Sequence, residues 1–204
     1  MLDPDALVIA CNTASTTALP SIRAAVDIPV IGVVPAIKPA AEQSVTRTIA
    51  VLGTPGTVRR KYVDDLIADF APDCHVLLQG STRLVAEAEH KLAGRAVDMD
   101  VVREEIAPLF SNRVGADVDA VVLACTHFPL LRDELLAAVR QSVKWIDSGE
   151  AIARRLEDVL SEIEKKPLPD HAQTAFLIGP NTDSVRAQAF ADYGFARTIG
   201  LMRE

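Results

Sequence analysis

The chain has 204 residues, of which 49% are hydrophobic and 24% charged, and its formal net charge is −7. This composition is typical of a globular protein, and the length suits either one large domain or two small ones. The net negative charge argues against nonspecific binding to nucleic acid, so we expect no nucleic-acid partner. No apolar run approaches the ~18 residues that cross a bilayer, so we expect no membrane partner.

The hydrophobic pattern alternates between short β-branched or leucine-rich runs and longer helical stretches. Strands are predicted at 6–10, 29–34, 48–52, 75–78, 119–124, 143–146 and 174–178. Helices are predicted at about 15–25, 38–44, 55–69, 81–92, 98–113, 129–140, 148–163 and 182–192. Because strands that alternate with helices form parallel sheets, we expect an α/β fold with mainly parallel sheets. The stretch 164–173, EKKPLPDHAQ, is the most loop-like and precedes a last strand and helix.

The N-terminus and the cysteines indicate the compartment. The first residues, MLDPDALVIA, lack the basic region and long apolar core of a signal peptide. The three cysteines, Cys11, Cys74 and Cys125, are widely spaced and form no CxxC pair. Free thiols in a reducing compartment are the simplest interpretation, which predicts a cytoplasmic protein.

Two segments of the chain resemble each other. LVIACNTAST at 7–16 and VVLACTHFPL at 121–130 both consist of an apolar strand, then Ala-Cys, then polar residues before a helix. The similarity indicates two related α/β units, each with a cysteine at the carboxyl end of a strand, where open α/β sheets bind ligands. Chance similarity between two buried strands is the alternative.

A thiol between a strand and a helix lies near backbone N–H groups and the positive end of the helix dipole, which favours thiolate. Asn12 and Thr13 follow the first cysteine, and Thr126 and His127 follow the second. Each residue also has a plainer interpretation: a buried cysteine as a small hydrophobic residue, a polar residue as a helix cap, and a lone histidine as a structural group.

The duplication favours the chemical interpretation. Two thiols that face each other across a cleft form a two-base site, in which one removes a proton from a carbon and the other returns a proton on the opposite face. The result is racemisation or epimerisation. The developing carbanion needs N–H groups or polar side chains directed at the substrate carboxylate.

The two cysteine motifs, ACNTAST at 10–16 and ACTHFPLL at 124–131, resemble those of glutamate racemases in the cofactor-independent aspartate/glutamate racemase superfamily. The segments PVIGVV at 29–34 and VLGTPGTVRRKYVDDL at 51–66 extend the resemblance, as does GSTRLVAEAEHKLAG at 80–94. The resemblance implies interconversion of L- and D-glutamate without a cofactor and supply of D-glutamate for peptidoglycan. It also makes a homodimer an expectation.

The resemblance implies roles for particular residues. Cys11 and Cys125 become the catalytic acid/base pair, while Cys74 matches neither motif and is expected to be structural. The substrate-binding residues are then Asn12, Thr13, Thr126 and His127. The implied architecture is two pseudosymmetric α/β domains with the active site in the cleft between them, one comprising 1–34 plus 146–204 and the other 35–145.

The chain departs from the family pattern in two places. The family has a longer segment before its first catalytic cysteine, with an Asp-Ser-Gly motif whose carboxylate assists a thiol, so the first domain is expected to be incomplete. The Asp-Ser-Gly at 147–149 lies elsewhere, and Asp147 or Ser148 is expected to cap a helix. An ungapped match also places Ala86 where the family often has a supporting glutamate. Whether Glu87 or Glu89 replaces it is left open.

Three alternatives remain. The first is a racemase for aspartate or another amino acid. The second is a hydrolase that uses Cys125 and His127, which leaves Cys11 unexplained and requires residues two apart to reach each other. The third is an inactive truncated remnant of a racemase.

The histidines His75, His90, His127 and His171 show no metal-ligand spacing, and we expect no metal. The loop GTPGTV at 53–58 lacks a phosphate-loop ending, and we expect a turn with Thr54 or Thr57 near the cleft.

Overall fold

The computed structural model describes residues 4–163, 173–178 and 184–201. Its strands are β1 (Leu7–Ile9), β2 (Val30–Gly32), β3 (Thr48–Gly53), β4 (His75–Gly80), β5 (Ala120–Ala124), β6 (Lys144–Ile146), β7 (Thr174–Ile178) and β8 (Arg197–Leu201). Its α-helices are α1 (Asn12–Ala25), α2 (Ile37–Gln43), α3 (Pro55–Val58), α4 (Lys61–Phe70), α5 (Arg83–Leu92), α6 (Met99–Ile106), α7 (Arg132–Ala138), α8 (Gly149–Ser161) and α9 (Ser184–Asp192). Short 3₁₀ turns are η1 (Ala107–Leu109), η2 (Gly115–Asp117) and η3 (Phe128–Leu131).

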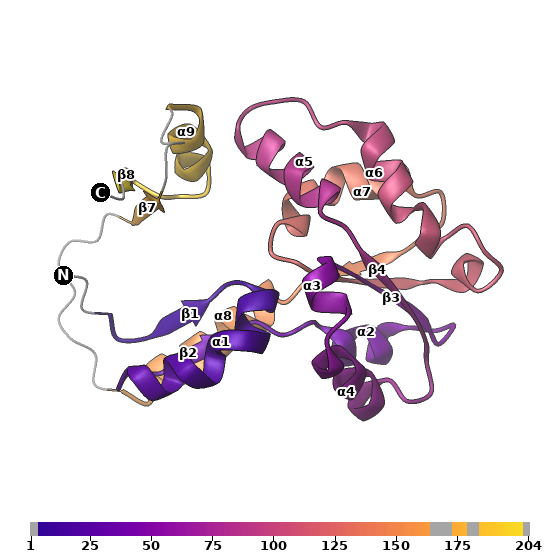
Figure 1. The fold of residues 1–204 in the computed structure, drawn as a ribbon, viewed down its shortest axis with the longest axis horizontal. Coiled ribbons are helices and arrows are strands. Elements are labelled where there is room, and N and C mark those ends of the chain that lie inside the picture. Colours follow the sequence, from indigo (N-terminus) through magenta and orange to yellow (C-terminus); the bar gives the residue numbers. More distant parts are fainter. Residues whose placement is uncertain (1–3, 164–172, 179–183, 202–204) are drawn as a thin grey trace.

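The largest sheet has the strand order β4-β3-β5-β6, and every neighbouring pair is parallel. Its two central strands, β3 and β5, are buried along their whole length. Helices α5, α6 and α7 cover one face of this sheet, and α2, α3 and α4 lie on the other side (Figure 1). This arrangement confirms the predicted α/β fold with mainly parallel sheets.

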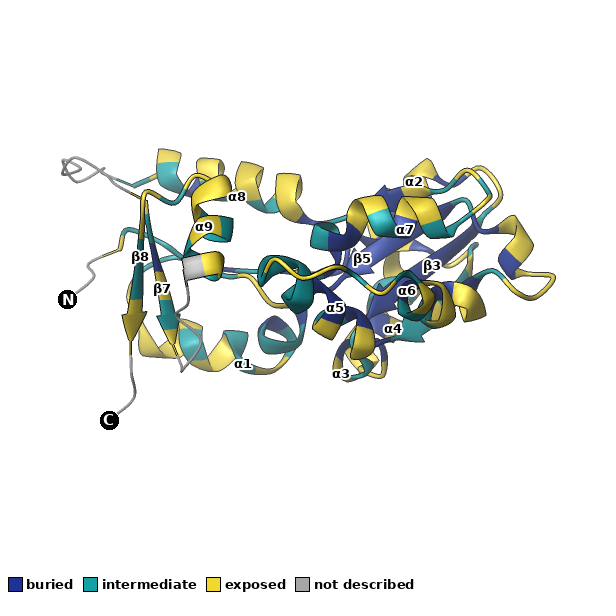
Figure 2. Cartoon of the chain, turned by 90° about the horizontal axis from the view of Figure 1, so that it is seen from above, coloured by how far each residue is buried: buried dark blue, intermediate teal, exposed yellow. Residues whose placement is uncertain are grey.

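The central strands divide their side chains between two cores. Ala50 and Leu52 of β3 belong to the core beneath α5, α6 and α7. Ile49 and Val51 alternate with them and belong to the core beneath α2 and α4. Because successive side chains of a strand point to opposite faces, a sheet covered on both sides needs an unbroken apolar strand sequence. Figure 2 shows the resulting buried layer along β3 and β5, while most helices expose their outer faces.

Two smaller parallel sheets lie outside this core. Strand β1 pairs with β2, and β7 pairs with β8. Helix α1 packs on β2, and α9 packs on both β8 and α5. In Figure 1, β1, β2, α1 and α8 extend to the left of the large sheet, and β7, α9 and β8 lie above them at the same end of the molecule. The predicted division into 1–34 plus 146–204 and 35–145 stays a prediction.

The chain passes between the β1-β2 region and the large sheet at two places. One connection follows β2, and the other joins β6 to α8. The hydroxyl of Ser148, at the start of α8, donates a 2.6 Å hydrogen bond to the carbonyl oxygen of Val34, after β2. Asp147 beside it accepts from the backbone N–H of Gly149, so it caps α8 as predicted.

Several helix boundaries differ from the predictions because of local chemistry. The helix expected at 55–69 is divided into α3 and α4, because Arg60 is extended between them. The helix expected at 98–113 ends at Ile106, where Pro108 supports only a 3₁₀ turn, since proline removes a helical N–H and clashes with the preceding turn. Strand β8 was not predicted, and most of the predicted loop at 164–173 lies outside the described residues.

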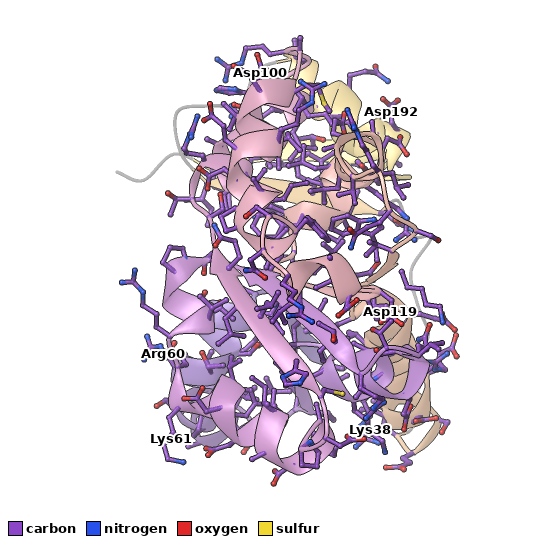
Figure 3. The ribbon with its side chains drawn as sticks, turned by 90° about the vertical axis from the view of Figure 1, so that its right-hand side faces the viewer. Lys38, Arg60, Lys61, Asp100, Asp119 and Asp192 are labelled. Atoms are coloured by element: carbon purple, nitrogen blue, oxygen red, sulfur yellow. The ribbon has the colours of Figure 1, made fainter. Side chains whose placement is uncertain are left out.

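Charged side chains cover the outside of these layers. Figure 3 shows Lys38, Arg60 and Lys61 projecting away from the ribbon. Within the part of the chain that the structure describes, no helix has the length and apolarity to cross a membrane.

Candidate functional site

A cavity of about 220 Å³ lies where the carboxyl ends of β1, β3 and β5 meet the helices that follow them. All six predicted site residues line it, together with two further threonines and three apolar residues. The lining comprises Ala10, Cys11, Asn12, Thr13, Thr54, Thr57, Val85, Ala124, Cys125, Thr126 and His127. The carboxyl ends of strands from two different sheets therefore bring the two cysteine motifs to one cavity.

Cys11 forms the N-cap of α1. It has extended backbone angles, and its sulfur accepts a 3.4 Å hydrogen bond from the backbone N–H of Ala14. The sulfur thus occupies the place of the serine or aspartate oxygen that usually caps a helix, beside the positive end of the helix dipole. Cys11 is exposed. The sequence suggested Asn12 or Thr13 as the cap of this helix, but Cys11 occupies that position.

Cys125 follows the last residue of β5 and is only 7% exposed. Burial raises the pKa of its thiol, because a thiolate loses solvation there. Hydrogen bonds from the backbone N–H groups of His127 and Phe128 lower this pKa, while the charge of Cys11 raises it.

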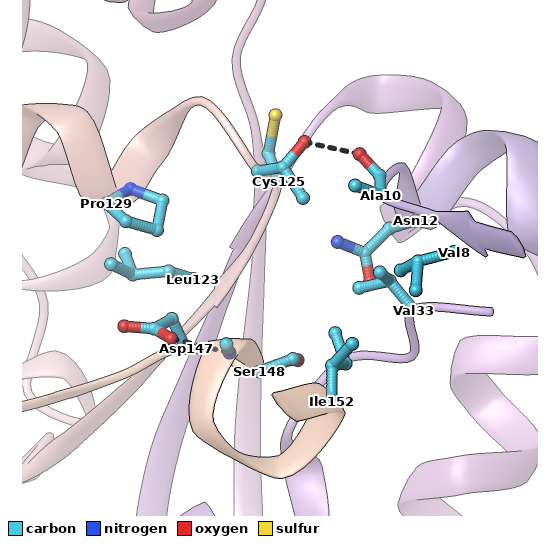
Figure 4. A pocket seen from close by; sticks show the side chains of 12 residues that line it. Val8, Ala10, Asn12, Val33, Leu123, Cys125, Pro129, Asp147, Ser148 and Ile152 are labelled. Carbon is cyan, nitrogen blue, oxygen red and sulfur yellow. Dashed lines mark hydrogen bonds between the residues drawn. The ribbon is translucent and has the colours of Figure 1, made fainter. Parts of the chain in front are cut away.

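The two cysteine-bearing strand ends are joined by a direct contact. The hydroxyl of Thr126 donates a 3.0 Å hydrogen bond to the carbonyl oxygen of Ala10. Figure 4 shows this bond between the residues that flank the two thiols. It links the two cysteine motifs directly.

Three hydroxyl groups form a closed cluster in the wall of the cavity. The hydroxyl of Thr13 lies 3.2 Å from that of Thr54 and 2.9 Å from that of Thr57, and the last two are 3.1 Å apart. Thr13 comes from α1, whereas Thr54 and Thr57 come from the turn into α3. The cluster offers hydroxyl donors to an anionic group such as a carboxylate.

His127 lies between Cys125 and a carboxylate. Its Nδ1 is 3.9 Å from the sulfur of Cys125, and its Nε2 is 3.0 Å from Oε1 of Glu89 on α5. Residues two apart therefore do reach each other here. Glu87 has a different place: it is buried, and its Oε2 accepts a 2.8 Å hydrogen bond from the backbone N–H of Asp98.

A second cavity of about 290 Å³ shares Ala10, Asn12, Cys125 and Thr126 with the first. Its other walls are mostly apolar, and Ser148 and Ile152 of the α8 region close one side (Figure 4). Asn12 lines both cavities, is 3% exposed, and its buried Oδ1 has no hydrogen-bond partner among the described residues. An orphaned buried amide oxygen is costly unless a donor reaches it.

The sequence missed Val85, which lines the cavity. It named Glu87 and Glu89 as candidates without deciding between them, and Glu89, one helical turn after Val85, is the one that contacts His127. A signal was available: residues four apart on a helix share a face, so a cavity-facing Val85 would have implied Glu89. Arg186 of α9, whose Nη2 lies 3.5 Å from Oε2 of Glu89, carried no local signal. Cys74 lies outside the cavity and packs against the core beneath α2 and α4.

Comparison with known proteins places the chain in a family. The family model described as Asp/Glu/Hydantoin racemase matches residues 1–156. Glutamate racemase from Shewanella sp. (strain MR-4) is 51% identical over 196 residues, which cover 93% of this chain and 71% of that protein. Glutamate racemase from Pasteurella multocida (strain Pm70) is 46% identical over 198 residues, covering 97% and 72% respectively.

A solved structure agrees with these matches. The crystal structure of Escherichia coli glutamate racemase in complex with L-glutamate and the activator UDP-MurNAc-Ala superimposes with a TM-score of 0.90 at 39% identity. The match covers 97% of this chain and 74% of that one. The chain therefore belongs to the glutamate racemases of the Asp/Glu/Hydantoin racemase family and is, by that membership, an amino-acid racemase, an isomerase.

Proposed function

We propose that the chain interconverts L- and D-glutamate in the first cavity, with Cys11 and Cys125 as the acid/base pair and no cofactor. The observation that carries this proposal is that a single cavity is lined by both thiols. Family membership supports the choice of substrate, since the relatives reported above are glutamate racemases. The D-glutamate formed would be used for peptidoglycan.

In this mechanism one thiolate takes the α-proton of glutamate, and the opposed thiol donates a proton to the other face of the same carbon. The reaction in the reverse direction exchanges the two roles. The C–H bond broken on one face is replaced by a C–H bond on the other, so configuration inverts and no redox change occurs. The α-proton is weakly acidic, so the negative charge that develops toward the carboxylate needs stabilisation.

The residues around the thiols are suited to this stabilisation. The hydroxyls of Thr13, Thr54 and Thr57 and the N-terminal end of α1 would receive the substrate carboxylate. Asn12, Thr126 and His127 would make the remaining polar contacts. A donor on the substrate, such as its ammonium group, would also satisfy the unpaired amide oxygen of Asn12.

A second candidate function is a Cys-His hydrolase, favoured by the line from Cys125 through His127 to Glu89. It resembles the nucleophile, base and orienting carboxylate of covalent catalysis. The hydrolase needs only Cys125, whereas the racemase needs both thiols. This difference makes the two candidates separable by mutation.

The test incubates L-glutamate with the chain in D₂O and follows α-deuteration by NMR and configuration by chiral chromatography. We expect deuterated D-glutamate, and we expect Cys11→Ser and Cys125→Ser each to abolish it. Cys74→Ser is the matched control, because Cys74 lies outside the cavity, and it should retain activity. L-Aspartate in the same assay tests the substrate. Racemisation by either cavity mutant at the parent rate, or none by the folded parent chain, would refute the proposal.

A further inference from the structure

Ser148 occupies the N-cap position of α8, but its hydroxyl does not cap the helix. Asp147 caps it instead, by accepting from the backbone N–H of Gly149. A serine is favoured at an N-cap because its side chain can accept from the helix. The hydroxyl of Ser148 is used differently: it donates its 2.6 Å hydrogen bond to the carbonyl oxygen of Val34, 114 residues away in the sequence. What this buried serine contributes is therefore the link to Val34.

Ser148 is fixed to the part of the chain that carries Cys125. Asp147 and Ser148 directly follow β6, which pairs in parallel with β5, and Cys125 directly follows β5. The carboxylate of Asp147 also lies 3.9 Å from the guanidinium of Arg132 at the start of α7. The turn that carries Ser148 is thus held against the large sheet.

Val34 is tied to the part of the chain that carries Cys11. The residue before it, Val33, donates its backbone N–H to the hydroxyl of Ser15 at 2.9 Å. That hydroxyl in turn donates to the carbonyl oxygen of Ile9, at the end of β1, at 3.2 Å. Ser15 lies one helical turn from Cys11, the N-cap of α1. A path of hydrogen bonds therefore leads from the helix capped by Cys11 to the acceptor of the Ser148 bond.

The Ser148 bond is a second direct link between the two parts that carry the thiols. The first is the bond from Thr126 to Ala10. The cavity of about 290 Å³ is lined by residues of both links and by Cys125. Figure 4 shows Ala10 near the top of this cavity and Ser148 near the bottom. A single hydrogen bond between two bodies leaves them free to rotate about it, whereas two bonds at opposite ends of a cavity restrict that rotation.

We propose that Ser148 is a positioning residue for the racemase site, whose bond to Val34 fixes how the thiols of Cys11 and Cys125 face each other. Inversion by two bases requires both sulfurs to be aligned with one carbon, and a small misalignment of reacting groups lowers the rate strongly. Without the Ser148 bond, the part that carries Cys11 can turn about the bond made by Thr126. The inference rests on the proposed function only for what the aligned thiols then do.

The first test measures the alignment of the thiols without using racemase activity. Dibromobimane is a short bifunctional alkylating reagent that becomes fluorescent when both of its ends have reacted with thiols. In a Cys74→Ser background, Cys11 and Cys125 are the two thiols that it can join. We expect Ser148→Ala to slow this cross-linking about tenfold. Alkylation of each single thiol by iodoacetamide should stay nearly unchanged, because the substitution changes the orientation of the thiols and not their ionisation.

Steady-state kinetics give the second test. Ser148→Ala should lower kcat for racemisation about tenfold with KM for glutamate nearly unchanged, since the alignment of the two bases matters most in the transition state. Ser148→Thr keeps the hydroxyl and should restore both kcat and the cross-linking rate. The fold should be retained in both variants, because Asp147 still caps α8.

Ser161→Ala is the matched control. Ser161 lies at the other end of α8, and its hydroxyl donates to the carbonyl oxygen of Asp158 of the same helix. Removal of this exposed hydroxyl should leave cross-linking, kcat and KM as in the parent chain.

Equal cross-linking rates in the parent and in folded Ser148→Ala would overturn this proposal, as would the absence of a cross-link in the folded parent chain. Slower cross-linking in Ser148→Ala, together with no racemisation by the parent, would support the link and count against the proposed function alone. The two failures are therefore distinguishable.

Discussion

The hydroxyl of Thr126 donates a 3.0 Å hydrogen bond to the carbonyl oxygen of Ala10, and this bond joins the strand ends that carry the two cavity cysteines. Because these residues are far apart in the sequence, the bond exists only in the folded chain. Its hydroxyl is exposed, so its loss should affect the geometry of the cavity more than the stability of the fold.

Thr126→Val should therefore lower kcat/KM for racemisation about tenfold, with little change in melting temperature, because the thiols are no longer held at a fixed spacing. Thr126→Ser keeps the hydroxyl and should retain most of the activity. Steady-state kinetics in both directions and a thermal melt would test this. Equal activity of the Val and Ser variants would contradict the idea.

The threonine cluster gives a prediction about substrate binding. Thr57 is fully buried, and Thr57→Val removes only its hydroxyl while preserving its shape. If the cluster receives a substrate carboxylate, KM for glutamate should rise about tenfold, as expected for the loss of one charge-assisted hydrogen bond. Thr17→Val, on α1 but with its hydroxyl bonded to backbone carbonyls, is the control and should behave like the parent.

Glu87 and Glu89 are two residues apart on α5, yet we predict opposite results for them. Glu87 is buried and accepts from the backbone N–H of Asp98, so Glu87→Ala should lower the free energy of unfolding by about 2 kcal/mol. It should leave the rate at which iodoacetamide alkylates Cys125 unchanged. Glu89 instead contacts His127, which approaches the Cys125 sulfur. Glu89→Ala should therefore change the alkylation rate of Cys125 and leave the free energy of unfolding nearly unchanged. Urea denaturation and alkylation kinetics of both variants would test this. A loss of stability in Glu89→Ala, or a changed alkylation rate in Glu87→Ala, would contradict the prediction.

The loop at 44–46 provides a prediction about pH. Burial opposes ionisation of Asp119, but hydrogen bonds from Ser44, Val45 and Thr46 outweigh it and hold the pKa of this carboxyl below its usual range. A lowered pKa means that the contribution to stability is present above the unfolded-state value, about pH 4, and is lost as the pH falls through the folded-state value.

Asp119→Asn should accordingly cost about 1–2 kcal/mol of unfolding free energy at pH 7, and the difference from the parent chain should shrink below about pH 4. Urea titrations at pH 7 and pH 3 would measure it. Asp117→Asn, an exposed neighbour, serves as the control. A difference that stays constant over this range would show that the charge of Asp119 is not what stabilises the loop.

Much of the fold could be predicted because its signals are local. The apolar runs of β3 and β5 predict strands buried on both faces, since every side chain of such a strand lies in a core. The helix boundaries were less accurate where single residues intervene: Pro108 ends α6 early, and Arg60 separates α3 from α4. Strand β8 has too weak a pattern, with a glycine and an exposed arginine, to be recognised alone.

The sequence by itself determined the identities of the two thiols and their polar neighbours, because each motif is a short stretch at the end of a strand. Only the tertiary structure decided which distant groups meet them: Thr54 and Thr57 beside Thr13, Glu89 beside His127, and Arg186 beside Glu89. The physical reason is the difference between local and long-range interactions. A strand end or a helix cap is set by the residues next to it, whereas a contact between α9, α5 and the end of β5 depends on how three separately folded segments pack, which no local pattern specifies.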